Sequence, residues 1–157
     1  VALRTLHAAG ADVPEPLAAH DNALVMDYLG EPGVSAPTLH GVRLDPDEAP
    51  ALLQRIMRNV EIMLSLGMVH GDLSAYNVLY WSGQILLIDF PQVVNSTRNR
   101  AARQLLLRDV TRVCQYFRPY GIVSDPESIV EDLWYRYAED AITSEEQLRD
   151  LYAGPIS

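Results

Sequence analysis

The chain has 157 residues, of which 48% are hydrophobic and 21% are charged, and its formal net charge is −9. This composition is typical of a globular domain rather than a disordered segment, and the negative charge argues against a general nucleic-acid-binding surface. The single cysteine, Cys114, excludes an internal disulfide framework and suits a reducing cytoplasm. No apolar run reaches the roughly 20 residues of a membrane span, so we expect no membrane partner.

The first elements that the sequence predicts are a helix, a connection and a strand. Apolar residues recur at helical spacing over residues 1–7, and Pro14 and Pro16 mark a connection. Residues 23–26 form an apolar run that is typical of a strand. Residues 31–44 contain two prolines and two glycines and are expected to form a surface loop.

A long amphipathic helix is predicted next. Acidic residues at its first turn place its start near residues 45–48, although Pro50 leaves the first residue open. Gly67 is suited to end it. The apolar residues that follow helical spacing are Leu52, Leu53, Ile56, Met57, Val60, Met63 and Leu64.

A β-hairpin is predicted after this helix. Residues 77–81 and 84–88 are rich in β-forming residues, and a Ser-Gly pair between them supplies a two-residue turn. Because a hairpin brings its two ends together, Asn77 and Asp89 are expected to lie close to each other.

Three polar side chains in this part of the chain have the types and the spacing that phosphoryl transfer requires. Asp72 lies five residues before Asn77, and Asp89 lies twelve residues after it. Phosphoryl transfer needs a group that orients the acceptor hydroxyl and takes its proton, and it needs oxygen ligands for Mg²⁺. We assign the first role to Asp72 and the second to Asn77 and Asp89. The alternative is that all three are ordinary turn and strand-end residues.

Arginine dominates the stretch from Arg98 to Arg118, where Asp109 is the one acid. Two interpretations remain open: a solvated helix face, or a positive surface that binds an acidic partner, a phosphorylated partner or RNA. Asp109 shares helical spacing with apolar neighbours and can point inward. Cys114 lies in the same apolar pattern and is expected to be buried.

Two further helices are predicted toward the end of the chain. Asp125 and Pro126 begin the first, and the spacing of Thr143 and Glu146 is that of a capping box at the start of the second. The apolar residues on one face of the first helix are Ile129, Val130, Leu133, Trp134 and Tyr137. Core packing is the expected use of these residues.

Residues 70–81 read HGDLSAYNVLYW and residues 85–95 read ILLIDFPQVVN. These segments resemble the RIO family of atypical protein kinases, whose motifs are a D-L-S-x-Y-N catalytic loop and an I-D-F/V-x-Q metal motif. The hinge-like MDYLGE at residues 26–31 and the RDV at residues 108–110 extend the resemblance, which covers roughly residues 1–120. The D-x4-N and I-D core alone is shared with aminoglycoside- and choline-kinase-like enzymes.

The resemblance implies an α+β, protein-kinase-like fold. Residues 1–30 would be the end of the N-lobe and the hinge, and residues 31–157 would be the mostly α-helical C-lobe with its catalytic β-hairpin. In the family's hinge, backbone groups of Asp27 and Leu29 would bind the adenine edge of ATP, and Met26 would lie behind the adenine.

The resemblance also assigns roles around the catalytic loop. His70 is expected to pack and hydrogen-bond so that the loop is fixed, and Asp109 is expected to brace the loop backbone. Ser74 would either support the loop or contact a phosphate or ribose, and we place it among the nucleotide-binding residues. Tyr76 is expected to pack under the hairpin.

One departure from the family is large: all twelve residues counted as lysine or arginine are arginine. Kinases of this superfamily hold the α- and β-phosphates with a lysine paired with a helix glutamate. No glycine-rich phosphate loop is visible either. We therefore expect an N-terminally truncated chain that begins at the end of the glutamate-bearing helix. A kinase that evolved without its lysine is the alternative.

The implied activity is that of an ATP-dependent protein serine/threonine kinase, or of an ATPase that acts as a switch, in the cytoplasm. ATP and Mg²⁺ or Mn²⁺ would be its cofactors. Two alternatives are a small-molecule phosphotransferase of the aminoglycoside or choline kinase type and a non-catalytic, kinase-like binding fragment. The truncated chain alone is expected to be inactive.

Overall fold

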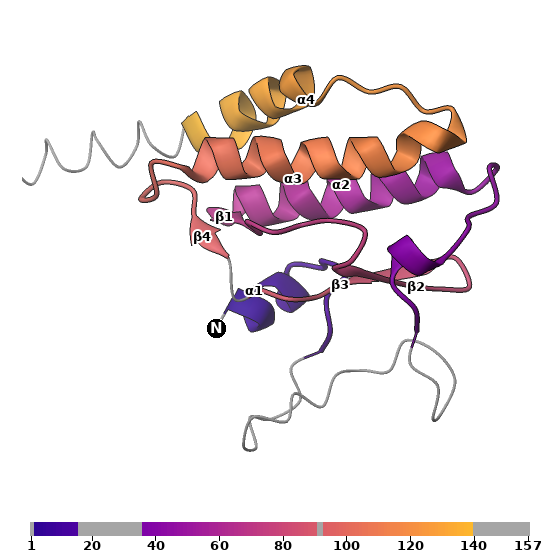
Figure 1. Ribbon diagram of the computed structural model, residues 1–157. Helices are drawn as coiled ribbons and strands as arrows, with labels where there is room; N and C mark the ends of the chain where they lie inside the picture. The colour runs from indigo at the N-terminus through magenta and orange to yellow at the C-terminus, as the bar shows by residue number, and fades with distance from the viewer. Residues whose placement is uncertain (1, 16–35, 91–92, 140–157) are drawn as a thin grey trace, which may run out of the picture.

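The computed structural model describes residues 2–15, 36–90 and 93–139 (Figure 1). Its helices are α1 (Ala2–Ala8), α2 (Ala49–Ser65), α3 (Ala102–Phe117) and α4 (Pro126–Leu133), with the short 3₁₀ helices η1 (Leu39–Gly41) and η2 (Arg118–Tyr120) and the π-helical η3 (Trp134–Glu139). Its strands are β1 (Met68–Val69), β2 (Val78–Trp81), β3 (Gln84–Leu87) and β4 (Val94–Asn95).

Several predictions fall outside these ranges. The expected strand at residues 23–26 and the last short helix lie among residues that the structure does not describe. The predicted lobe boundary at residue 30 lies there too and stays a prediction. Within the described ranges, no helix is long and apolar enough to cross a membrane.

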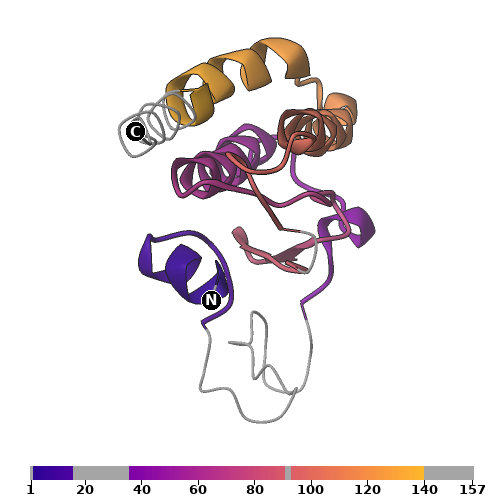
Figure 2. The same cartoon turned by 90° about the vertical axis from the view of Figure 1, so that its left-hand side faces the viewer.

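Helices α2 and α3 lie side by side, with α4 on one side of the pair and the strands and α1 on the other (Figures 1 and 2). Both central helices are amphipathic, and their apolar stripes face the core, as their spacing predicts. The larger buried residues of these stripes are Leu52, Ile56, Val60, Met63 and Leu64 on α2 and Leu106, Val110, Val113 and Phe117 on α3. Removing these side chains from water is the main favourable term for this arrangement.

Helix α2 begins at Ala49, later than the acidic residues suggested. The preceding acidic residues form a turn, in which the Glu48 N–H donates to the Asp45 carbonyl at 3.0 Å. Pro50 fits the first turn of a helix because the amide hydrogen that it lacks would have no partner within the helix. The helix ends just before Gly67, whose φ of 75° provides the left-handed conformation predicted there.

The predicted hairpin is confirmed. Strands β2 and β3 pair antiparallel, with Val78 opposite Leu87 and Trp81 opposite Gln84. The two turn residues both have positive φ, which is the conformation of the tight turns that match the twist of paired strands. A second pair, β1 with β4, brings the chain that follows the hairpin back to the start of the catalytic loop.

Asp12 ties the segment after α1 to α2 and to β3. Its carboxylate accepts from Arg55 Nε at 2.6 Å, from Arg55 Nη2 at 2.7 Å and from Asn59 Nδ2 at 2.8 Å. Its N–H donates to Asn59 Oδ1 at 2.6 Å, and its carbonyl accepts from the Leu87 N–H at 2.8 Å. Burial acts to raise the pKa of Asp12, but the bonds from Arg55 and Asn59 and the charge of Arg58 lower it overall.

Asp12→Asn should lower the free energy of unfolding by about 2 kcal/mol at pH 7, because an amide replaces a carboxylate that accepts charge-assisted hydrogen bonds. Since folding lowers the pKa of Asp12, its contribution is present above the unfolded value of 3.8 and is lost as pH falls through the folded value. Urea denaturation of the wild-type and Asp12→Asn proteins from pH 7 to pH 3 should therefore show that the difference between their free energies of unfolding becomes smaller in acid. A difference that stays constant with pH would contradict the assignment of the effect to the ionised carboxylate.

Candidate active site

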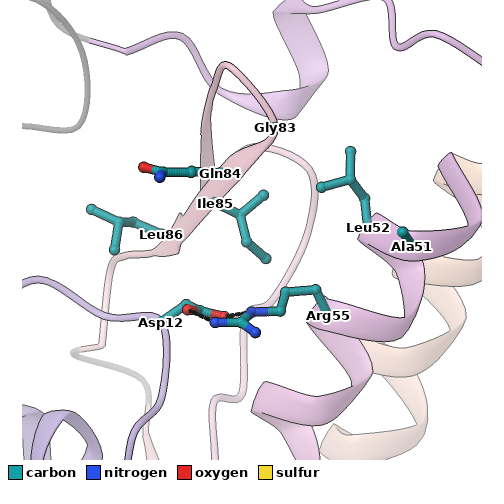
Figure 3. A pocket seen from close by; sticks show the side chains of 8 residues that line it. All are labelled: Asp12, Ala51, Leu52, Arg55, Gly83, Gln84, Ile85 and Leu86. Carbon is teal, nitrogen blue, oxygen red and sulfur yellow. Dashed lines mark hydrogen bonds and ion pairs between the residues drawn. The ribbon is translucent and has the colours of Figure 1, made fainter. Parts of the chain in front are cut away.

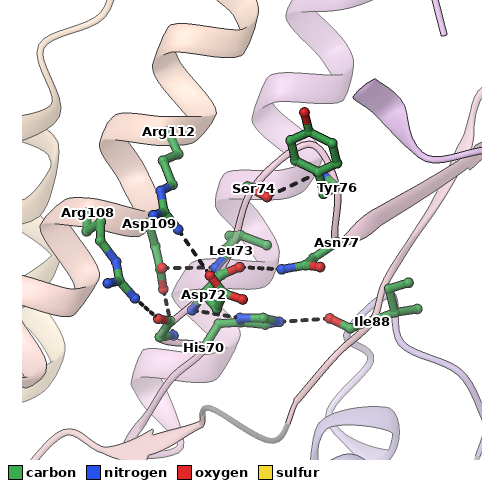
Figure 4. Close-up of polar contacts among 11 residues, drawn as sticks. His70, Asp72, Leu73, Ser74, Tyr76, Asn77, Ile88, Arg108, Asp109 and Arg112 are labelled. Carbon is green, nitrogen blue, oxygen red and sulfur yellow. Dashed lines mark hydrogen bonds and ion pairs between the residues drawn. The ribbon is translucent and has the colours of Figure 1, made fainter. Parts of the chain in front are cut away.

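The loop between β1 and β2 carries the predicted catalytic residues, and His70 fixes its first turn (Figure 4). The Asp72 N–H lies 3.2 Å from His70 Nδ1, and His70 Nε2 lies 2.8 Å from the Ile88 carbonyl oxygen. An N–H can only donate, so Nδ1 is the acceptor and Nε2 carries the proton that it donates to Ile88. His70 is 2% exposed and hydrogen-bonds within the loop, as predicted, and it also joins the loop to the end of the hairpin.

Asp109, from α3, braces the same loop. Its carboxylate accepts from the N–H groups of Gly71 at 2.8 Å and Leu73 at 3.0 Å. Burial raises the pKa of Asp109 above its ordinary value, although these two hydrogen bonds and the nearby His70 and Arg108 act in the opposite direction. The predicted inward orientation of Asp109 and its bracing contacts are confirmed.

Asp109→Asn should destabilise the protein by about 3 kcal/mol, because an asparagine amide cannot accept both backbone hydrogen bonds and one buried N–H loses its partner. Chemical denaturation measures the loss. Asp132→Asn is the matched control: its carboxylate pairs with Arg136 on an exposed helix face, and its loss should change stability by less than about 1 kcal/mol. Equal effects of the two substitutions would show that Asp109 does not support the loop.

Asp72 lies at the exposed edge of this braced loop. Its carbonyl accepts a hydrogen bond from Asn77 Nδ2, and its carboxylate oxygen Oδ1 lies 3.1 Å from Arg112 Nη1 (Figure 4). The Asp72 side chain is half exposed, so an acceptor group from solvent can reach it. The loop therefore holds the backbone of Asp72 firmly while its carboxylate stays accessible.

Asn77 and Asp89 come together through the hairpin, as predicted. The Ile88 N–H donates to the Asn77 carbonyl at 2.9 Å, and Asp89 is the next residue. Asp89 is exposed and has a φ of 60°, a conformation that few residues other than glycine adopt but that aspartate tolerates.

These residues fit a Mg²⁺ site that is completed by phosphates. A carbonyl can only accept, so the amide nitrogen of Asn77 faces Asp72 and its oxygen is the atom available to a cation. Over residues 2–15, 36–90 and 93–139, no cluster of three or more His, Cys, Asp or Glu side chains could hold a metal alone. One amide oxygen and one carboxylate suit Mg²⁺, which usually keeps waters and binds substrate phosphates as well.

Ser74 supports the loop locally, because its hydroxyl accepts from the Tyr76 N–H at 3.2 Å. The expectation for Tyr76 is wrong: its side chain does not pack under the hairpin but is 60% exposed. Its ring stacks on His40, with centroids 4.0 Å apart, and its hydroxyl lies 3.0 Å from His40 Nε2. The motif could not predict this contact, because His40 lies in η1, 36 residues upstream.

The arginines of residues 98–118 do not share one role. Arg108 donates to the Gly71 carbonyl and Arg112 reaches Asp72, so two of them contact the catalytic loop. Arg108 is exposed nonetheless, and so are the remaining four, Arg98, Arg100, Arg103 and Arg118. The prediction of a single arginine surface did not include the two loop contacts. The i, i+4 spacing of Arg108 and Arg112 around Asp109 was the available signal.

The predicted hinge residues Met26, Asp27 and Leu29 lie outside the described residues. Their assignment stays a prediction.

A cavity of 460 Å³ lies away from this loop, between the start of α2, the β2–β3 hairpin and Asp12 (Figure 3). Leu52 and Ile85 line it, together with the Asp12–Arg55 ion pair. None of the predicted catalytic or metal-binding residues that the structure describes lines it, so this cavity is separate from the candidate site.

The fold is that of a protein kinase. The structure matches the Rio2 kinase–ADP/Mg²⁺–phosphoaspartate complex from Chaetomium thermophilum with a TM-score of 0.64 and 21% sequence identity, covering 95% of this chain and 52% of that one. The expected α+β, protein-kinase-like fold is therefore confirmed.

The sequence comparisons give the family. The RIO domain model matches residues 1–129. Rio1 of Haloferax volcanii, a RIO-type serine/threonine-protein kinase, is 36% identical over 124 residues, which are 78% of this chain and 41% of that protein. Rio1 of Thermoplasma acidophilum is 33% identical over 129 residues, 82% of this chain and 66% of that protein. The chain belongs to the RIO domain family, and it spans less than two thirds of the length of these relatives.

Proposed function

We propose that the protein containing this chain is an ATP-dependent serine/threonine protein kinase of the RIO type, or an ATPase that uses the same site as a switch. One observation carries the proposal. Asp72 and Asn77 lie on one loop, and the hairpin returns Asp89 to it, while buried groups from His70 and Asp109 fix that loop. Phosphoryl transfer depends on such prior positioning more than on covalent chemistry by the protein.

Asp72 is the group that orients the acceptor and takes its proton. Its carboxylate is half exposed, whereas both of its backbone polar groups are held by other residues of the loop. A carboxylate that is accessible but fixed in position can accept a hydrogen bond from an approaching hydroxyl and then its proton.

Asn77 and Asp89 would hold Mg²⁺ or Mn²⁺ through the amide oxygen and the carboxylate. The metal, when bound, would neutralise charge on the phosphates of ATP. The hydrogen bond from Asn77 to the Asp72 carbonyl then has a second use: it links the metal ligand to the backbone of the catalytic aspartate.

For the nucleotide, we retain the family's arrangement. Residues 1–30 would supply the hinge, with Met26 behind the adenine and Asp27 and Leu29 at its edge, and Ser74 would lie near a phosphate or ribose. The structural relative is described as a complex with ADP, Mg²⁺ and a phosphoaspartate. That description supports ATP and Mg²⁺ as ligands here and is compatible with the ATPase version of the proposal.

We also propose that the arginines from Arg98 to Arg118 that are exposed bind an acidic or phosphorylated partner or RNA, since their positive charge stands out in an acidic chain. A cytoplasmic location is part of the proposal. The free, buried thiol of Cys114 is compatible with a reducing compartment.

The test uses the full-length protein with γ-labelled ATP and Mg²⁺. Label on a protein acceptor would support the kinase form. Steady release of phosphate without an acceptor would support the ATPase form. Label on small alcohols with none on protein would favour a small-molecule phosphotransferase. The absence of both nucleotide binding and turnover would favour a non-catalytic binding role.

A further inference from the structure

Three groups of Asp72 are held by three different residues (Figure 4). The N–H donates to His70, the carbonyl accepts from Asn77, and carboxylate oxygen Oδ1 lies 3.1 Å from Arg112 Nη1. Among the described residues, no hydrogen bond or ion pair to the other oxygen, Oδ2, is found. Arg112 is therefore in a position to orient the Asp72 carboxylate.

The contact belongs to a set on one face of α3. Arg108 donates to the Gly71 carbonyl, and Asp109 accepts from the N–H groups of Gly71 and Leu73. These contacts fix the loop backbone. Arg112, one turn further along the helix, contacts the side chain of Asp72 instead.

The exposure of both side chains indicates that the Arg112–Asp72 ion pair contributes little to the stability of the fold. The Arg112 side chain is 40% exposed and that of Asp72 is 50% exposed. Ion pairs in contact with solvent contribute little to folding, because water screens them and two side chains lose freedom. The loop is already fixed by Asp109 and His70, so the Arg112 contact is not needed for that purpose.

We propose that Arg112 is a positioning residue for the phosphoryl-transfer step: by holding Oδ1 it directs Oδ2 of Asp72 toward the acceptor hydroxyl. This inference rests on the proposed function. In that step the acceptor oxygen forms a bond to the γ-phosphorus. The bond from that phosphorus to the β,γ-bridging oxygen breaks, with its electron pair leaving on ADP. The hydroxyl proton passes to Oδ2.

The guanidinium group suits this role better than an ammonium group would. Its donors lie in a rigid plane, so a contact with Oδ1 also limits rotation of the carboxylate, whereas lysine is a flexible point charge. Arg112→Lys should therefore retain part of the positioning of the Asp72 carboxylate, and of the rate that depends on it. Arg112→Ala should retain none of this positioning.

The test is a double-substitution cycle in the full-length protein, with γ-labelled ATP. Arg112→Ala should lower kcat about tenfold with the KM for ATP within about twofold, since poor orientation slows the chemical step without removing nucleotide contacts. Combined with Asp72→Asn, it should cause no further loss, because the carboxylate that it positions is gone. Arg43→Ala, which removes an exposed arginine outside α3 and outside the Arg98–Arg118 stretch, is the control and should match wild type.

Several outcomes would overturn the inference. They are a full tenfold loss on top of Asp72→Asn, a rise in KM for ATP with kcat unchanged, and an Arg112→Ala rate equal to that of the Arg43→Ala control. If Arg112→Ala does not fold, the Arg112→Lys and Arg112→Gln variants carry the same cycle. Absence of any turnover in the wild-type protein would instead refute the proposed function, and this inference with it.

Discussion

Asp89→Ala should abolish Mg²⁺-dependent ATP turnover in the full-length protein, with a loss of at least about 10³-fold. The described residues offer the metal one carboxylate and one amide at this site, with no larger cluster of acidic or histidine ligands. Removing the carboxylate leaves a neutral amide oxygen, which holds a strongly hydrated cation poorly. Steady-state phosphate release across a range of Mg²⁺ concentrations measures the effect.

Asp47→Ala is the matched control for that experiment. Asp47 is an exposed carboxylate in the turn before α2, and its loss should leave turnover unchanged. Normal turnover by Asp89→Ala at ordinary Mg²⁺ concentrations would remove the metal assignment. Recovery of activity at high Mg²⁺ would support a weakened site.

Asp72→Asn should leave ATP affinity nearly intact while the rate of phosphoryl transfer falls by about 10²–10⁴-fold. Asparagine has almost the same shape as aspartate, and its amide oxygen can still accept from Arg112, so the loop geometry should persist. It cannot take a proton from the acceptor. Single-turnover transfer and equilibrium ATP titration, measured on the same preparation, separate chemistry from binding.

Opposite changes in these two quantities would reverse the assigned roles. A large loss of ATP affinity with normal transfer would place Asp72 with the nucleotide rather than with the acceptor. Equal loss from Asp72→Asn and Asp72→Ala would agree with a proton-accepting role, whereas full activity in Asp72→Asn would contradict it.

The hairpin and the inward orientation of Asp109 could be predicted because their signals are local or periodic, whereas the bracing role of Asp109 came from the family resemblance. Two β-forming runs around a Ser-Gly turn determine the pairing of β2 with β3, and this pairing brings Asn77 close to Asp89. Asp109 occupies an inward position on an amphipathic helix. A carboxylate that is buried there is costly unless it is hydrogen-bonded, so its presence indicates hydrogen-bond partners.

Two of the features that the sequence did not predict are contacts between segments that are distant in sequence. Tyr76 stacks on His40 instead of packing under the hairpin, and Arg112 reaches Asp72 across 40 positions. The start of α2 was also placed early, because Asp45 and its neighbours can cap a turn as well as a helix. Neither spacing nor composition specifies which side chain of one element meets which side chain of another.

The most direct test of the account is a crystal structure of the full-length protein with ADP and Mn²⁺, in which anomalous scattering locates the metal. The account predicts one Mn²⁺ ion in contact with the Asn77 amide oxygen, the Asp89 carboxylate and a phosphate oxygen of the nucleotide, with the Asp72 carboxylate free to face an acceptor. A nucleotide and metal bound away from Asn77 and Asp89, or a metal coordinated by Asp72 in place of Asp89, would contradict it.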